Sequence, residues 1–552
     1  MSTLFDIFGF LSGVLRGLDL VAQSILLGSV SFALFIAAPL ESDAPRGVRT
    51  IAPGVRHCIQ AAALAAVMAA TANTAVSAAV LAASLDVSWR EVAGAGFVIA
   101  GSVKAVAAAA IGLVVSLRPL ATRSTRITIG TAAALVLYEG LASSHATARL
   151  SDSTLLLFAT GAHELGAALW LGGLPCFWLA LRHADTRETL NQTGRRFSVL
   201  AIIGVAMIVV GALVFAPTYI GSLDAVYGTA YGAMVVTKSI MFGMLVLLGF
   251  ANFRAVRRFT ADGAAVQQVR RFVEVEMGVG FAVLMAAASI TSMPPAVDLR
   301  DDRVSFAELV ERMAPTTPRL QSPDHALLAI PALQARLDDE RARQTSTRTL
   351  AFVPGSGVLA TRNAYDLAWS EYNHHWAGLL VVLMGLAALA QRSGHAPWAK
   401  HWPLLFLLLA AFLFFRADPE VWPMGESGLI ESLKDPEVAQ HRLFVVLIVA
   451  FALFEWRVRT GRVVSHRSMR VFPLLTALGG TLLLTHSHAL GNVKEELLVE
   501  MTHLPIAVLG ITAGWARWLE VGARGKELRW AGWLWPSCFV LIGLLLLSYR
   551  EA

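Results

Sequence analysis

The chain has 552 residues, of which 56% are hydrophobic and only 15% are charged, and its formal net charge is +6. A soluble globular domain carries roughly 25% charged residues, so this composition excludes an ordinary soluble protein and indicates a membrane protein. The positive charge requires no nucleic-acid partner, because arginines and lysines are retained in the cytoplasmic loops of membrane proteins.

The apolar runs predict an all-α polytopic membrane protein with about 14 transmembrane helices, since each run approaches the roughly 20 residues that cross a bilayer. The first run lacks a small-residue cleavage site and is too long for a signal peptide, so we expect it to be retained. The predicted spans are 15–39, 57–84, 92–117, 127–147, 154–181, 197–220, 229–252, 271–293, 375–391, 400–416, 441–457, 470–487, 495–517 and 530–548.

Charged loops predict the orientation of these spans. The loops after the odd-numbered spans contain clusters of Arg and Lys, whereas the loops after the even-numbered spans contain few or are acidic. Because positive loops stay in the cytoplasm, both termini are expected in the periplasm. We therefore expect a multi-pass protein of the bacterial inner membrane, surrounded by the lipid bilayer.

The spacing of the spans predicts three parts. Residues 1–297 form an eight-helix membrane domain, and residues 371–552 form a six-helix membrane domain. The periplasmic loop between them, 298–370, is too long to be structureless in a compact protein. Helical periodicity predicts short helices in this loop at Ser305–Met313 and Pro331–Arg343.

A pattern that contains histidine occurs twice, in Gly140–Gly173 and in Leu482–Trp515. In each copy an apolar run ends in Ser-His-Ala, a polar turn follows, and another histidine, His163 or His503, lies about two turns into the next run. Intramembrane histidines are functional candidates, and the recurrence indicates an internal repeat. His163 and His503 can face each other across the two halves as metal ligands, or they can form hydrogen bonds between helices.

The predicted topology places eight of the 14 histidines in the periplasmic half of the membrane. Imidazole binds Cu(II), and imidazole or thioether groups can bind Cu(I), so this set favours copper. The candidate ligands are His145, His163, His374, His375, His441, His486, His488, His503, Met293 and Met424.

Several of these histidines also have a structural explanation. His374, His375 and His441 lie at predicted helix ends, where an amphipathic histidine is often only solvated. His486 and His488 would diverge by about 200° on a helix, so they can share one ion only if the helix ends there.

Four ionisable side chains within the spans, Glu139, Glu164, Lys238 and Glu276, are further polar candidates. Each would cost about 2.5–3.5 kcal/mol at a lipid-facing position, so we expect them to face the bundle interior. For Lys238 we expect a salt bridge with Glu139 or Glu164. For Glu276 we expect pairing with Arg270–Arg271 near the cytoplasmic edge.

The three cysteines, Cys58, Cys176 and Cys538, are far apart in the sequence and form no CxxC motif. The sequence therefore predicts neither a disulfide framework nor an all-thiolate metal site. No Walker A pattern is present, so we expect no ATP-driven step. We assign no catalytic residues and expect a protein that is not an enzyme.

An ordered set of residues runs through the first half of the chain: Ser144-His145-Ala146, His163, Ala167, Trp170, Gly172, Gly173, Arg196-Phe197-Ser198, Thr229, Tyr231, Gly232, Lys238, Arg270-Arg271, Glu276 and Met293-Pro294-Pro295. Over roughly residues 10–297 this set resembles the CopD family of bacterial copper-resistance and copper-transport membrane proteins. Residues 371–552 resemble the C-terminal extension of longer CopD-like proteins. The resemblance implies copper movement across the inner membrane, often with a periplasmic CopC-type copper-binding partner.

Two classes of function follow. The first is a copper permease that takes Cu(I) or Cu(II) from the periplasmic side through a histidine-rich outer site. A variant of it is an assembly factor that delivers copper to a membrane oxidase. The second class is a haem-binding electron-transfer protein, because histidines on neighbouring helices can ligate haem axially.

Overall fold

All regular elements of the computed structural model are helical within the residues that it describes, in agreement with the predicted all-α fold. These residues are 2–43, 45–142, 153–184, 186–257, 263–300, 302–314, 316–323, 334–335, 338–339, 342, 363–418, 421–425, 428–433, 436–465, 467–485, 493–522 and 528–551.

The chain divides into two compact units. Unit 1 comprises Met1–Val226, Met234–Asp301 and Thr485–Ser487. Unit 2 comprises Tyr227–Ala233, Asp302–Leu484 and His488–Ala552. The three predicted parts, with their limits at 297 and 370, stay predictions.

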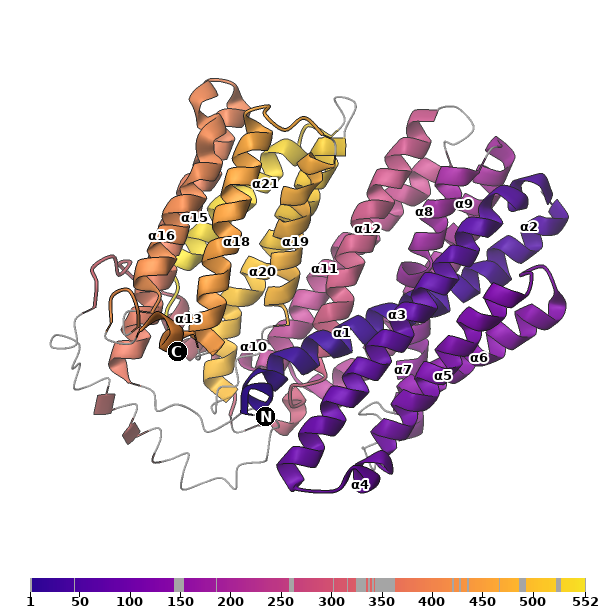
Figure 1. Ribbon diagram of the computed structural model, residues 1–552, viewed down its shortest axis with the longest axis horizontal. Helices are drawn as coiled ribbons and strands as arrows, with labels where there is room; N and C mark the ends of the chain where they lie inside the picture. The colour runs from indigo at the N-terminus through magenta and orange to yellow at the C-terminus, as the bar shows by residue number, and fades with distance from the viewer. Residues whose placement is uncertain are drawn as a thin grey trace. The chain divides into compact units, whose positions relative to one another are not determined.

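Unit 1 is a helical bundle whose first helix, α1 (Ser2–Phe32), packs against α3 (Pro45–Leu85), α12 (Gly263–Ile290) and the π-helical segment η3 (Ala168–Gly172). Figure 1 shows α3 beside α5 (Gly96–Leu117), with α6 (Arg123–Ala142) on the far side of α5. The other helices in this part of the chain are η1 (Ala33–Ala37), α2 (Ala38–Asp43), α4 (Trp89–Ala93), α7 (Ser153–Ala167), α8 (Leu174–His183), α9 (Arg187–Phe215), η4 (Ala216–Ile220), α10 (Leu223–Gly228), α11 (Ala230–Val256) and η5 (Ala296–Asp298).

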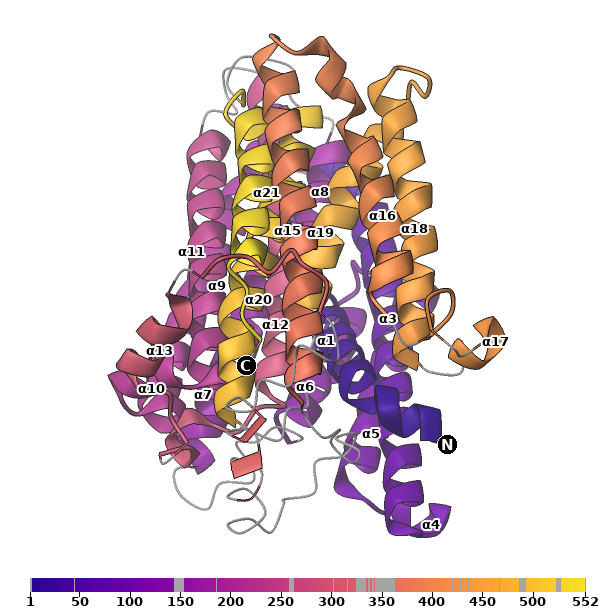
Figure 2. The same ribbon diagram turned by 90° about the vertical axis from the view of Figure 1, so that its left-hand side faces the viewer.

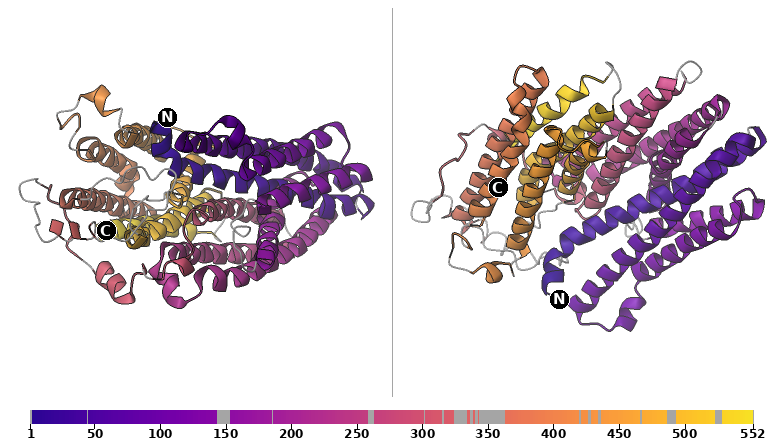
Figure 3. Two further views of the ribbon diagram at one scale, coloured as in Figure 1. Left: turned by 90° about the horizontal axis from the view of Figure 1, so that it is seen from below. Right: turned by 45° about the horizontal axis from the view of Figure 1, so that its top comes forward.

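Unit 2 is built around α21 (Ala531–Leu547), which packs between α15 (Ala364–Ser393) and α20 (Val493–Gly522) (Figure 2). On its other side α20 packs along α19 (Val471–Leu483). The orange and yellow helices of this unit also form a bundle in both views of Figure 3. The remaining helices are α13 (Phe306–Met313), η6 (Pro397–Leu404), α16 (Leu405–Arg416), α17 (Leu429–Ser432), α18 (Pro436–Arg459) and η7 (Ser468–Arg470).

Every predicted span falls on a helix, and ten helices within the described residues are long and apolar enough to cross a membrane. α6 and α18 are not among the ten, and α19 and α21 belong to shorter apolar helices. The spans predicted at 127–147 and 470–487 continue into residues outside the described ranges. The total of fourteen and the periplasmic location of both termini therefore stay predictions.

The two copies of the predicted repeat pack differently. α19 and α20 lie against each other, whereas α7 packs mainly against α9 and only lightly against α6. The polar turns of both copies lie outside the described residues. The similarity of the two copies therefore does not extend to the way their helices pack.

Two glycines allow α1 to approach η3 closely. A Cβ atom on Gly172 would lie 1.8 Å from the carbonyl oxygen of Ser24, and one on Gly28 would lie 2.1 Å from the carbonyl carbon of Gly172. Small residues permit this kind of backbone approach between membrane helices. Because η3 leads directly into α8, the same approach places the middle of α1 beside α8.

The helix predicted at Ser305–Met313 is confirmed as α13, and Ser305 is its N-cap. The Glu308 backbone N–H donates to the Ser305 hydroxyl at 3.2 Å, and the Ser305 N–H donates to the Glu308 carboxylate at 2.7 Å. This capping box satisfies two N-terminal donors of the helix. The bonds from Ser305 also lower the pKa of the exposed Glu308 carboxyl. Most of the helix predicted at Pro331–Arg343 lies outside the described residues.

Replacement of Gly172 by Ala should lower the free energy of unfolding by about 1–3 kcal/mol, the usual cost of overpacking. Gly243→Ala in α11 is the matched control, because a Cβ there meets no atom within 4 Å. The control should be neutral or stabilising by up to about 1 kcal/mol, since Ala favours helix. Denaturant unfolding of both variants in detergent measures the difference, and equal stabilities would contradict the proposed close approach.

Candidate functional site

Unit 1 holds a buried ion pair and a neighbouring hydrogen bond inside its bundle. Lys104 Nζ of α5 lies 2.7 Å from Asp19 Oδ2 of α1, and both side chains are largely buried. One turn further along α1, Gln23 Nε2 donates to Glu164 Oε2 of α7 at 3.0 Å. Ionisable groups at membrane depth are tolerated when they pair inside the protein. These two contacts therefore connect α1, α5 and α7 through polar groups.

Glu276 of α12 is buried, with 2% of its surface exposed. Its Oε1 accepts a hydrogen bond from the Trp170 indole at 2.6 Å, and its Oε2 accepts one from Asn252 Nδ2 at 2.5 Å. The predicted pairing of Glu276 with Arg270–Arg271 is wrong. Arg271 instead pairs with Glu274 at 2.8 Å, because Glu274 and Glu276 lie about 200° apart on the helix.

His163 of α7 is held against α9. Its ring Nδ1 lies 3.1 Å from the Ile208 carbonyl oxygen, and its ring packs on Phe215 with the centroids 5.5 Å apart. Gly211 leaves the space for this contact, since a Cβ there would lie 2.9 Å from His163 Cβ. The hydrogen bond between helices that the sequence offered as an alternative role for His163 is therefore present.

The predicted salt bridge of Lys238 with Glu139 or Glu164 is wrong, since no such ion pair occurs among the described residues. Glu164 accepts its hydrogen bond from Gln23, and Lys238 of α11 lies instead within electrostatic range of His163. Adjacent residues on a helix point about 100° apart, so His163 and Glu164 meet different neighbours. Glu139 is partly exposed on α6.

Unit 2 brings two of the predicted ligands together. The rings of His374 on α15 and His503 on α20 lie with their centroids 6.0 Å apart and nearly perpendicular, at 87°. Tyr549, which follows α21, stacks on His374 at 3.8 Å and meets His503 edge-on at 5.8 Å. The Tyr549 hydroxyl donates to Glu551 Oε2 at 2.6 Å. Burial and the Glu551 carboxylate raise the pKa of the Tyr549 phenol, so it stays protonated as this donor.

Backbone carbonyls define the tautomer of both rings. His374 Nδ1 lies 2.8 Å from the Ser370 carbonyl oxygen, and His503 Nδ1 lies 2.9 Å from that of Val499. A carbonyl oxygen only accepts, so each Nδ1 carries the proton. In a neutral imidazole the lone pair is then on Nε2, which is the arrangement found in metal-ligating histidines. His163, bonded to Ile208, has the same tautomer.

His375 differs from its neighbour because both of its ring nitrogens are occupied. Its Nδ1 accepts from the Arg319 backbone N–H at 2.7 Å, and its Nε2 donates to the Tyr549 carbonyl oxygen at 2.8 Å. His375 is also buried, with 2% exposed. These contacts connect α15 to the chain before and after it, and they leave no ring nitrogen for a metal.

The other candidates in the described residues lie apart from this pair. His441 Nδ1 of α18 contacts Asp418 Oδ1 at 2.7 Å, which also leaves Nε2 unprotonated when the ring is neutral. Met424 is 55% exposed, and Met293 is buried in unit 1. His145, His486 and His488 lie outside the described residues. Within the described ranges, no group of three or more His, Cys, Asp or Glu side chains is arranged to hold a metal ion.

Two carboxylates on α20 were missed by the sequence analysis. Glu500 lies three residues before His503 and is 2% exposed, and its Oε2 has no partner among the described residues. Glu496 lies one turn earlier on the same helix. Their i, i+4 spacing at the beginning of an apolar run was visible in the sequence.

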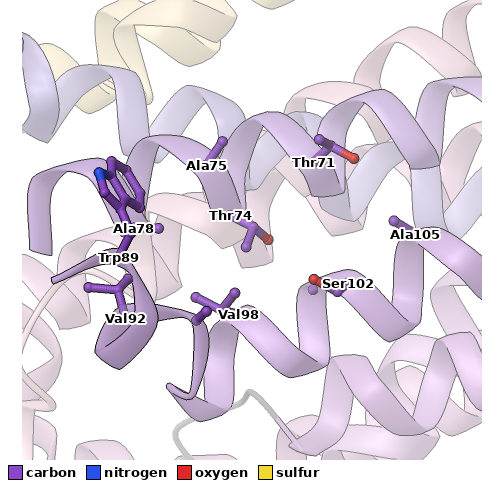
Figure 4. Close-up of a pocket in the computed structure, with 11 residues that line it drawn as sticks. Thr71, Thr74, Ala75, Ala78, Trp89, Val92, Val98, Ser102 and Ala105 are labelled. Carbon is purple, nitrogen blue, oxygen red and sulfur yellow. The ribbon is translucent and has the colours of Figure 1, made fainter. Parts of the chain in front are cut away.

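A pocket of about 220 Å³ lies elsewhere, between α3, α4 and α5 (Figure 4). Trp89 lies at one end of it, and Thr71, Thr74 and Ser102 are its polar lining residues. The pocket contains none of the predicted ligands, so it is separate from the histidine pair.

Two of the three cysteines, although far apart in the sequence, lie close together in the structure. The thiols of Cys58 on α3 and Cys176 on α8 lie within electrostatic range of each other in unit 1, although 118 positions separate them in the sequence. Cys176 is fully buried and Cys58 is partly buried. Sequence spacing failed here because packing of α3 on α8, not a local motif, brings them together.

Long apolar helices with paired polar groups between them define a polytopic helical membrane protein. Residues 191–290 match the family model described as Copper resistance protein D (CopD), so this segment of the chain is similar to that family. The match includes Arg196, Lys238, Arg270 and Glu276 of the predicted resemblance, whereas His163 lies outside it.

The chain is also 31% identical over 171 residues to the copper transport protein CutJ of Bacillus subtilis (strain 168). This similarity covers 29% of the chain and 30% of the length of that relative. No solved structure matches the chain significantly.

Replacing Glu276 tests how much its contribution to stability depends on the hydrogen bond from the Trp170 indole. We expect Glu276→Leu to destabilise unit 1 by about 1–3 kcal/mol, because the buried indole and amide donors lose their acceptor. Trp170→Phe should remove part of the same interaction, so the double variant should show a coupling of about 0.5–3 kcal/mol. Unfolding of the two single variants and the double variant in detergent measures this coupling, and strict additivity would contradict it.

Proposed function

We propose that this protein moves copper across the membrane and that His374 and His503 bind the ion during its passage. The observation that carries the proposal is the pair of imidazoles whose Nδ1 atoms are held by backbone carbonyls. The CopD match at residues 191–290 and the similarity to a copper transport protein support copper as the cargo.

The spacing of the two rings suits one ion between them. Metal–imidazole bonds are about 2.0–2.1 Å long, so two rings that bind one ion end-on have centroids about 6 Å apart. The centroids of His374 and His503 are 6.0 Å apart. Two neutral nitrogen ligands satisfy Cu(I), which accepts a coordination number of two. On this spacing we propose that the pair binds one copper ion without a third protein ligand.

Negative charge near the pair favours a cation. Glu551 accepts hydrogen bonds from Tyr549 and from Ser370, which lies one turn before His374. Carboxylates of this kind attract copper electrostatically but are harder ligands than imidazole, so they suit an approach path better than a final site.

In the predicted topology this pair belongs to the periplasmic half of the membrane, which supports uptake from that side. We propose a permease that receives copper from a periplasmic CopC-type protein, with the exposed Met424 near the entry. Delivery of copper to a membrane oxidase as an assembly factor would use the same pair. Pairing of His163 with His503 across the two halves also stays a prediction.

The haem alternative is less favourable at this pair. A haem between His374 and His503 would extend sideways from the line that joins the two rings. Tyr549 is stacked on His374 at 3.8 Å and is in edge contact with His503, so it fills part of that lateral space. A copper ion needs no such space. Purified protein should therefore lack a Soret band, and a haem content near one per chain would overturn the copper proposal.

His374→Ala and His503→Ala should each weaken Cu(I) binding by at least about tenfold, since loss even of a ligand's hydrogen-bond partner typically costs 10–100-fold in metal affinity. Competition titrations of the full chain in detergent, under reducing conditions, measure this effect, and uptake into proteoliposomes should fall with it.

His401→Ala is the matched control in unit 2, because His401 Nδ1 accepts from the Trp456 indole at 2.8 Å and has no contact with the pair. It should bind Cu(I) like the unaltered chain. Unchanged affinity in both His374→Ala and His503→Ala would remove the pair as a copper site. His163→Ala in unit 1 tests separately whether that ring is a ligand.

A further inference from the structure

We propose that Cys58 and Cys176 form a second copper site, a two-thiolate site for Cu(I) inside unit 1. This inference rests on the proposed copper function and adds a soft, sulfur-based site that the histidines do not supply. The two thiols come from α3 and α8, which pack against each other, and they lie within electrostatic range of each other.

Three helices meet at this pair. Ser29 of α1 lies with its hydroxyl oxygen 3.3 Å from Cys58 Sγ, and Cys176 is within interaction range of the same hydroxyl. Ser29 is 0% exposed and Cys176 is 0% exposed, whereas Cys58 is partly exposed. Cys176 is therefore the enclosed member of the pair, and Cys58 is the more accessible one.

The position of Ser29 depends on the glycine contact described above. Gly28 is its chain neighbour, and the absence of a side chain there allows α1 to lie against Gly172 and Gly173, directly before α8. Cys176 is one turn beyond Gly172. The close approach of α1 to η3 thus brings a hydroxyl donor to the two sulfurs.

The binding step balances without a redox partner. Each thiol loses its proton, the two thiolate sulfurs each form one bond to Cu(I), and the site gains one negative charge in total. Thiolate is the ligand type that selects Cu(I). The Ser29 hydroxyl can donate a hydrogen bond to one thiolate and so stabilise the added charge. Two protons are released for each ion that binds.

The location suits a late step of inward transport. Cys58 follows Arg56 by two residues, and Cys176 precedes Arg182 by six, and both arginines belong to predicted cytoplasmic loops. The histidines of the proposed entry belong to the predicted periplasmic half. A route from imidazole to thiolate ligands would carry Cu(I) towards the softer donors.

The test uses the full chain in detergent, a thiol-free reductant and Cu(I) alone. We expect Cys58→Ser and Cys176→Ser each to bind one copper fewer per chain and to lose copper–thiolate charge-transfer absorption and sulfur scattering at the copper edge. Cys538→Ser is the matched control, because Cys538 is a buried cysteine in α21 of unit 2, and it should keep all three signals.

The pH dependence gives a second measurement that needs no variant. Because two protons leave with each ion, affinity at the thiol site should rise by up to about a hundredfold per pH unit below the thiol pKa values. Binding to two neutral imidazoles should not rise in this way above their pKa. The unaltered chain therefore reports the site even if a serine variant fails to fold.

The possible failures are distinguishable. Suppose the bound copper shows scattering from nitrogen only, and Cys58→Ser and Cys176→Ser bind as much copper as the unaltered chain. That result would overturn the thiolate site and leave the proposed function standing. No copper bound by the unaltered chain would overturn both. Sulfur signals that survive in His374→Ala and disappear in Cys58→Ser would support two separate sites.

Discussion

The structure depends on one constraint: a polar side chain inside an apolar bundle must find its partner within the protein, because the bilayer supplies none. Glu276 satisfies it with the Trp170 indole and the Asn252 amide, and Lys104 satisfies it with Asp19. Each contact connects helices that are distant in the sequence. These partners therefore determine which face of each helix points inward, and the apolar residues pack around them.

The same constraint explains which ring nitrogens of the histidines are protonated and hydrogen-bonded. In His374 and His503 the Nδ1–H donates to a backbone carbonyl, so in a neutral ring the lone pair is on Nε2. His375, next in the chain, has both nitrogens bonded and is structural. Two adjacent histidines on one helix thus have different chemistry, because they point about 100° apart and meet different neighbours. Imidazole in one unit and thiol in the other offer Cu(I) donors of increasing softness.

Part of this was predictable from particular residues. Apolar length predicted where the helices lie, and Ser305 with Glu308 predicted a capped helix in the loop. The His163 and His503 positions indicated intramembrane polar sites, and both rings are hydrogen-bonded inside their units. The pairing of Glu276 with arginine was wrong, because charge and proximity in sequence do not reveal which helix face is buried. The proximity of Cys58 and Cys176 was missed for the same reason.

The sequence by itself determined the class of protein, the helix positions, the resemblance to the CopD family and the candidate copper ligands among the histidines. These are local or compositional properties, and they need only the hydrophobic length and the chemistry of each side chain. Only the tertiary structure decided which of those residues meet. A side-chain pair such as His374 with His503, or Cys58 with Cys176, forms where separate helices pack, and that packing depends on close contacts such as Gly172 against α1.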